Sequence, residues 1–144
     1  MEATNILYIT SINDIILDGD CIRKGVGENL FIIDKNSIRE SIDSLVSWSD
    51  KIIAALQLKS EDFSIIDLEQ ARLLRMTTLC KYYKNIIIFS PKYDSIGISA
   101  QLSPNIFYSF NSTNILFTES IDAVRDNDEL KKRFWLALKK HYLA

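Results

Sequence analysis

The stretch NILFTESIDAVRDNDELKKRFWLALKKHYLA, residues 114–144, decides the fold. It begins with a short apolar run, Ile115 to Phe117, which ends at Thr118, a residue type that often caps helices. A brief amphipathic turn follows. The acidic and amide side chains of residues 126–129 then suit the free N–H groups at the start of a helix. The stretch predicts a strand, a short helix and a capped terminal helix.

The terminal helix carries the largest apolar surface of any segment. Its apolar side chains recur at helical spacing and so share one face: Leu130, Phe134, Trp135, Leu138 and Tyr142. Phe134 and Trp135 together can bury roughly a few hundred square ångströms. We therefore expect this helix to seal the core, with Trp135 as a core side chain.

Lys131 has an unusual position within this helix. It precedes Trp135 by one helical turn, so it lies on or beside the apolar stripe. One interpretation is that its methylene stem lies along the indole ring while the ammonium group reaches water. The other is that Lys131 faces a partner at the rim of an exposed aromatic side chain.

Four runs of apolar residues predict strands. Residues 29–34 (NLFIID) and 86–89 (IIIF) are dominated by consecutive apolar side chains, which is typical of strands buried on both faces. Residues 106–110 and 115–117 are expected to form two further strands, joined by the polar residues 111–114. With helices between them, these strands predict a single-domain α/β fold. We expect a three-layer sandwich with a small mixed sheet and a C-terminal capping helix.

Two longer helices are expected between these strands. Ser37 and Glu40 have the spacing of a capping box and predict that the first helix begins there, with a bend or a break at residues 47–50. The second helix is expected over residues 68–83, because its apolar side chains recur at helical spacing. Residues 60–67 are expected to form a link that holds an apolar plug.

Composition excludes several functional classes. The net charge is -2, so the strongly basic surface that usually accompanies direct nucleic-acid binding is absent. A basic set in the second helix is therefore expected to be a solvated face: Arg72, Arg75, Lys81 and Lys84. No run approaches the roughly 18 apolar residues that cross a bilayer, and the first residues lack a basic signal-peptide region. We expect a cytoplasmic protein without a membrane segment.

The sequence offers no convincing catalytic set and implies no cofactor or metal. The single histidine, His141, lies near the end of the terminal helix, where a surface or rim position is expected. Cys21 and Cys80 do not have metal-ligand spacing. Asp34 ends a predicted buried strand, which is where an α/β enzyme can hold an acid, although a capping or loop role is commoner there. Ser90 ends the next apolar strand.

The first 20 residues are expected to form an apolar N-terminal arm, followed by a single domain over residues 21–144. The arm is either packed on the domain or orders on a partner protein. In the second case its partner-binding side chains would be Ile6, Tyr8, Ile12, Ile15 and Ile16.

Two segments carry a family resemblance. The C-terminal stretch has a Thr at the end of a strand, a short amphipathic helix, an N-x-x-x-K spacing and then W-x-x-L: Thr118, Ile121, Asn127, Lys131, Trp135 and Leu138. Earlier, a helix ending in A-L-x-L leads through an acidic link into another apolar segment: Ala55, Leu56, Leu58, Phe63 and Leu68. Both patterns, in this order, resemble the psi subunit of bacterial DNA polymerase III.

The resemblance implies a non-enzymatic subunit in DNA replication. In that family, psi joins the clamp loader to the chi subunit and, through chi, to single-strand DNA-binding protein. An N-terminal peptide of psi docks on the clamp loader, and residues 1–20 occupy the equivalent place. The resemblance therefore implies clamp-loader subunits and a chi-like subunit as partners, with Lys131 and Trp135 as candidate contacts.

Two alternatives stay open. One is a small α/β enzyme or nucleotide-binding domain with a site at the strand ends, near Asp34 and Ser90. The other is an adaptor module unrelated to replication, which differs from the psi-like protein only in its partner. A polar hollow near Asp34 would favour the first, and an exposed apolar patch near Trp135 would favour an adaptor.

Overall fold

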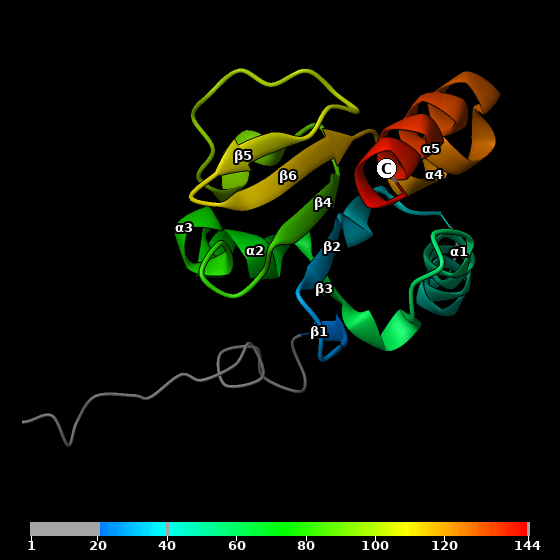
Figure 1. Cartoon of the computed structure of the whole chain (residues 1–144), viewed down its shortest axis with the longest axis horizontal. Helices are drawn as coiled ribbons and strands as arrows, with labels where there is room; N and C mark the ends of the chain where they lie inside the picture. The colour runs from blue at the N-terminus through cyan, green and yellow to red at the C-terminus, as the bar shows by residue number, and fades with distance from the viewer. Residues whose placement is uncertain (1–20, 40, 144) are drawn as a thin grey trace, which may run out of the picture.

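The computed structural model describes residues 21–39 and 41–143, and within them six strands form one mixed sheet (Figure 1). The strands are β1 (Cys21–Arg23), β2 (Asn29–Ile33), β3 (Phe63–Asp67), β4 (Asn85–Phe89), β5 (Tyr108–Phe110) and β6 (Thr113–Thr118). The helices are α1 (Ile42–Ala55), α2 (Leu68–Leu74), α3 (Met76–Leu79), α4 (Ile121–Asp126) and α5 (Asp128–Tyr142). In the described residues, three 3-10 turns join them: η3 (Lys35–Ser37), η4 (Ser60–Asp62) and η5 (Tyr93–Ile96).

The sheet has the strand order β1-β3-β2-β4-β6-β5. Its central strands β3, β2, β4 and β6 are parallel, and the edge strands β1 and β5 are antiparallel to their neighbours. From β2 the chain continues through α1 to β3, which lies beside one edge of β2. From β3 it continues through α2 and α3 to β4, which lies beside the other edge of β2. The strand order therefore reverses between β2 and β4, and this position is the switch point of a doubly wound sheet.

Helices cover both faces of the sheet, with α1, α4 and α5 on one side and α2 and α3 on the other (Figure 1). Side chains alternate between the two faces along each strand. Leu30 and Ile32 of β2 pack with the α2–α3 side, whereas Phe31 and Ile33 pack with the α1–α5 side. The structure thus has an α/β three-layer arrangement with a mixed sheet, as the sequence predicts.

The C-terminal stretch forms the predicted strand, short helix and long helix. The cap of the long helix lies within the predicted residues 126–129, whereas the cap of the short helix differs from the prediction. Thr118 is the last residue of β6 rather than a cap, and the Ser120 hydroxyl accepts the Ala123 N–H at the start of α4. Asn127 caps α5 through its side-chain oxygen, which accepts the Leu130 N–H. Apolar residues Phe134 and Leu138 then face the core, so α5 does cover it.

The β5–β6 hairpin is also confirmed. Its two turn residues, Asn111 and Ser112, both have positive φ, at 50° and 69°. Positive φ at both central positions is the geometry that matches the twist of a two-residue hairpin, and Asn adopts it readily.

The prediction of a link over residues 60–67 was wrong. Residues Phe63–Asp67 form β3, a strand between β1 and β2 that is buried along its whole length. A parallel strand buried on both faces shows no polar alternation. The acidic residues of η4 immediately before it made such a short apolar run look like a connector.

Two helix boundaries also differ from prediction. The first helix begins at Ile42 with Ser41 as its cap, not at Ser37, and it continues without a break to Ala55. The predicted helix over residues 68–83 is divided into α2 and α3 at Arg75, whose φ of 67° is incompatible with a helix. The N-terminal arm, residues 1–20, lies outside the described residues.

Candidate functional site

The carboxyl ends of the parallel strands are the first place to look for a ligand site, because doubly wound sheets bind ligands at this edge beside the switch point. Asp34 and Ser90 follow β2 and β4, which are paired in register up to Ile33 and Phe89. The structure therefore brings these two predicted residues to neighbouring strand ends. Both side chains are nearly buried, with 7% and 2% exposed.

The polar groups at this edge are engaged with local backbone. The Asp34 carboxylate accepts the Asn36 N–H at 3.1 Å and caps η3. Asp67 accepts the N–H groups of Lys35 at 2.8 Å and Glu69 at 3.3 Å, so it joins two connections and caps α2. The Ser90 hydroxyl accepts the Lys92 N–H at 3.0 Å. These side chains hold the loops after the strands, which is the capping role that the sequence favoured for Asp34.

Asp122 is a further buried carboxylate that contacts the segment after β2. Its carboxylate is buried and accepts the backbone N–H of Arg39 at 2.7 Å. It also pairs with the guanidinium groups of Arg125 at 3.0 Å and Arg39 at 3.4 Å. Asp122 thereby ties the segment after β2 to α4.

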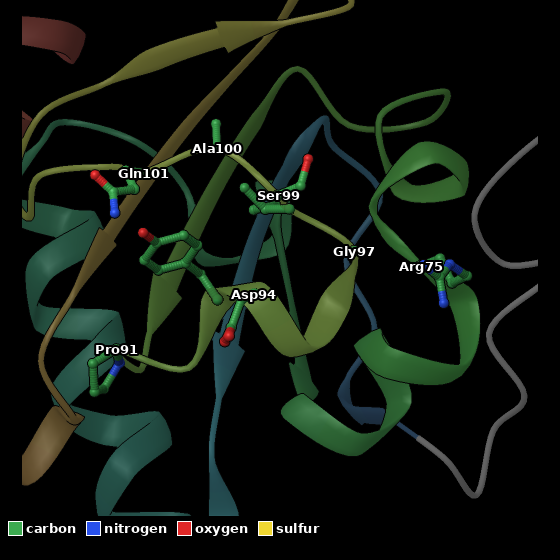
Figure 2. A pocket seen from close by; sticks show the side chains of 9 residues that line it. Arg75, Pro91, Asp94, Gly97, Ser99, Ala100 and Gln101 are labelled. Atoms are coloured by element: carbon green, nitrogen blue, oxygen red, sulfur yellow. The ribbon is translucent and has the colours of Figure 1, made fainter.

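An open polar hollow of about 640 Å³ lies beside this edge, between the loop after β4 and the start of α3. Figure 2 shows Arg75 on one side of Gly97, with Asp94, Ser99 and Gln101 arranged along the loop on the other side. The hollow contains one arginine and one carboxylate but no histidine or cysteine. It offers hydrogen-bonding groups, among them the Ser99 hydroxyl and the Asp94 carboxylate.

A second hollow, of about 210 Å³, lies between α1 and α5 and has a different character. We call it the α1–α5 groove. Its apolar wall combines two tryptophans with neighbouring apolar side chains, and two lysines stand in its lining: Trp48, Lys51, Ile52, Ala55, Lys131, Phe134 and Trp135. The groove lies over the buried aromatic core, because the Trp48 and Phe134 rings both meet Phe89 edge-on, at 6.2 and 5.3 Å.

The groove contains both predicted partner-binding residues that the structure describes. Trp135 is half-buried: it packs against the core cluster and also lines the groove, so the expectation of a core side chain holds only in part. Lys131 is exposed and lines the same groove. The cation placed over the Trp135 ring is Lys139, with its Nζ 5.7 Å from the ring centroid. The other predicted contacts lie outside the described residues: Ile6, Tyr8, Ile12, Ile15 and Ile16.

The amino ends of the strands hold a hydrogen-bonded row that the sequence interpretation missed. Asn29, Asn85 and Asn114 are in register at the starts of β2, β4 and β6. The Asn114 amide donates to the Asn85 oxygen at 3.3 Å, and the Asn85 amide donates to the Asn29 oxygen at 3.0 Å. Asn29 in turn donates to the carbonyl of Asp62 at 3.4 Å. We call these three residues the asparagine row.

The end of α5 docks on this row through two side chains. The His141 Nε2 lies 2.7 Å from the Asn85 oxygen, and the Tyr142 hydroxyl donates to the Asn29 oxygen at 2.9 Å. The His141 ring stacks on Phe107 at a centroid distance of 3.9 Å. Burial lowers the pKa of His141 and raises the pKa of Tyr142, so both rings favour their neutral forms. His141 is therefore a half-buried docking residue, which agrees with the rim position and not with the surface position among the two that were expected.

A repeated pattern in the sequence could have revealed this row. Asn is the first residue of β2 and β4 and the second residue of β6, and in each strand a run of apolar residues follows it: NLFII, NIIIF and NILF. When parallel strands with the same pattern pair in register, their equivalent residues lie side by side. Asn114 is expected from the sequence in the polar connector of residues 111–114 and is not related there to the other two asparagines.

Residues 21–39 and 41–143 give little support for a metal site or a reactive cysteine. No three His, Cys, Asp or Glu side chains there are close enough together to hold a metal ion. Burial raises the pKa of the Cys80 thiol, which disfavours the reactive thiolate. The basic set of the second predicted helix is exposed, as expected, and Arg72 and Lys84 are paired to Glu69 and Glu28.

None of the helices in the described part of the chain has the length and apolar character needed to span a membrane. In sequence, the chain matches no protein-family profile and no curated protein.

Proposed function

We propose that this protein is a non-catalytic interaction subunit that resembles the psi subunit of DNA polymerase III. It would bridge the clamp loader to other replisome proteins during DNA replication. The observation that carries the proposal is the α1–α5 groove, where two half-buried tryptophans line an apolar hollow next to exposed lysines. Partner-binding hot spots are typically rich in tryptophan and lie in apolar pockets surrounded by polar groups.

The residues of the psi resemblance have compatible positions. Asn127 caps α5, Leu138 anchors that helix in the core, and Lys131 and Trp135 line the groove. In this proposal the helix is held by its cap and its buried face, while its remaining face meets a partner. The polar groups at the carboxyl edge are occupied by capping, which lends an enzymatic function less support.

The proposal can be tested by capture from native lysate with the full-length chain as bait. We expect clamp-loader subunits to be recovered with the unmodified chain and to be strongly reduced with Trp135→Ala. Leu73→Ala is the matched control, because Leu73 is a large apolar residue that is 80% exposed on the opposite face of the sheet. Absence of clamp-loader subunits from the unmodified bait would refute a psi-like function.

The same assay can assign a role to the N-terminal arm. Replacing Ile12, Ile15 and Ile16 by serine in the full-length chain removes apolar contacts that an arm would supply to a partner. Loss of clamp-loader subunits with an unchanged melting temperature would give the arm a binding role. Unchanged capture would restrict binding to the folded domain.

A second candidate function is a small-ligand or nucleotide site, which is favoured by one observation. The polar hollow of about 640 Å³ adjoins Pro91, directly after Ser90 at the switch point of the sheet. A melting-temperature screen with nucleotides and dinucleotides tests it, because a ligand that binds only the folded state raises that temperature. A rise that Arg75→Ala abolishes would support this function, and no rise with any nucleotide would count against it.

A further inference from the structure

The charges around the α1–α5 groove are unbalanced. Lys51 and Lys131 line the groove and are exposed, and neither forms an ion pair within residues 21–39 and 41–143. Two carboxylates that are close in sequence to these lysines are paired with arginines. Asp50 pairs with Arg23, and Glu129 pairs with Arg133 at 3.2 Å. The unpaired lysines therefore leave positive charge beside the apolar floor.

The size of the groove limits what can enter it. Small-molecule sites usually have volumes of about 300–1,000 Å³, whereas this groove has about 210 Å³. A hollow of this size suits one inserted side chain better than a whole cofactor. Its floor of Trp48, Phe134 and Trp135 suits an aromatic or branched aliphatic side chain, since aromatic rings pack well edge-on or offset.

We propose that the groove binds an acidic peptide segment of another protein. One aromatic or aliphatic side chain of that segment enters between Trp48 and Trp135, and carboxylates on either side of it pair with Lys51 and Lys131. This inference rests on the proposed interaction function and adds the chemistry of the partner. Charge complementarity selects the acidic segment, while the apolar anchor supplies most of the affinity.

The natural partner is unidentified, so the probe is a phage-displayed library of random dodecapeptides selected on the immobilised full-length protein. Selected peptides are then synthesised and titrated while tryptophan fluorescence is recorded. The chain has only two tryptophans, Trp48 and Trp135, and both line the groove. The fluorescence signal therefore reports directly on occupancy of this site.

We expect the selected peptides to be enriched in Asp and Glu around a Phe, Trp, Leu or Ile. Binding should change the tryptophan fluorescence and weaken as salt is added. Lys51→Glu and Lys131→Glu should each weaken binding by about tenfold, because reversal replaces attraction with repulsion. Lys132→Glu is the matched control: Lys132 is an exposed neighbour on α5 that does not line the groove.

Three results would overturn the proposal. The first is no enrichment of peptides, and the second is enrichment of basic or uncharged ones. The third is acidic peptides whose affinity is equal in Lys131→Glu and Lys132→Glu. Sedimentation of the free protein adds a check, since a dimer that Trp135→Ala dissociates would make a second copy the occupant. These outcomes are independent of clamp-loader capture, so peptide binding can succeed where the psi-like function fails.

Discussion

The carboxyl edge of the sheet and the α1–α5 groove both collect side chains that could serve a function, but they differ in how those side chains are used. At the edge, Asp34 and Asp67 accept backbone N–H groups and hold the following turns. In the groove, Lys51 and Lys131 project from α1 and α5, and both tryptophans stay half-buried. The position of the edge in the fold favours it as a ligand site. The groove is favoured instead by its lysine and tryptophan side chains, which are exposed or half-buried and are not used in hydrogen bonds that hold the described part of the fold.

This difference separates stability from binding. A side chain whose hydrogen bonds are satisfied inside the protein contributes to folding, and its removal leaves buried groups unsatisfied. An exposed side chain without a partner contributes little to folding and is available to another molecule. Substitutions at the edge should therefore lower stability, whereas substitutions of the groove lysines should change binding alone.

The largest expected effect is at Asp122. Asp122→Ala removes a buried carboxylate that satisfies the Arg39 N–H and pairs with Arg125. We expect a loss of about 3 kcal/mol in the free energy of unfolding, because breaking a buried ion pair leaves its partners without compensation. Urea denaturation followed by circular dichroism measures it. Asp126→Ala is the control: its carboxylate is 50% exposed, so a loss below about 1 kcal/mol is expected.

Asn85→Ala extends this test to the other end of the sheet. It cuts the asparagine row at its centre and removes the acceptor of His141 and Asn114. We expect a loss of about 2 kcal/mol, because half-buried polar neighbours lose their partners. Asn36→Ala should cost far less, since that side chain is exposed. Equal losses in the two variants, measured by urea denaturation, would show that the row does not contribute to stability.

A smaller loss is expected at Trp135, on the floor of the groove. A fully buried tryptophan costs about 3–5 kcal/mol when truncated to alanine, and Trp135 is only half-buried. We expect Trp135→Ala to lower stability by about 1–2 kcal/mol while the protein still unfolds cooperatively. Phe134→Ala, at a buried neighbour, should cost clearly more. If the two losses were equal, Trp135 would be a core residue and the contrast between edge and groove would weaken.

The sequence predicts those elements whose hydrophobic pattern lies within one short segment of the chain. The strands β4 and β6 and the helix α5 follow from apolar runs and helical periodicity within a few turns of chain. The strand β3 was missed because its identity comes from its neighbours β1 and β2, which cover its edges. The division at Arg75 was missed because a positive φ in a non-glycine residue depends on tertiary packing.

Only one wall of the candidate site, the one on α5, could be predicted from the sequence. The periodicity of α5 drew attention to Lys131 and Trp135, but the opposite wall of the groove comes from α1. Trp48 belongs to the stretch that was expected to bend or break the first helix, so it was not associated with any surface. Pairing two helix faces requires knowing that α1 and α5 cover the same side of the sheet, and periodicity within one helix does not contain this information.

The smallest expected effect concerns pH and the end of α5. Burial lowers the pKa of His141 below its ordinary value of 6.5. As pH falls, His141 is therefore protonated at a higher pH in the unfolded chain than in the folded protein. Stability should therefore be unaffected by this group above pH 7.5 or so, and should fall as pH drops through about 6.5 towards the folded-state pKa. His141→Gln keeps a donor for Asn85 and cannot titrate. We expect a shallower loss of stability between pH 7.5 and pH 5.5 in this variant than in the unmodified protein, measured by urea denaturation at each pH.

Identical slopes of stability against pH in the two proteins would mean that the docking of α5 does not depend on a neutral His141. A steeper loss in the unmodified protein would make the histidine part of the stabilising framework, like the carboxylates of the edge and unlike the lysines of the groove.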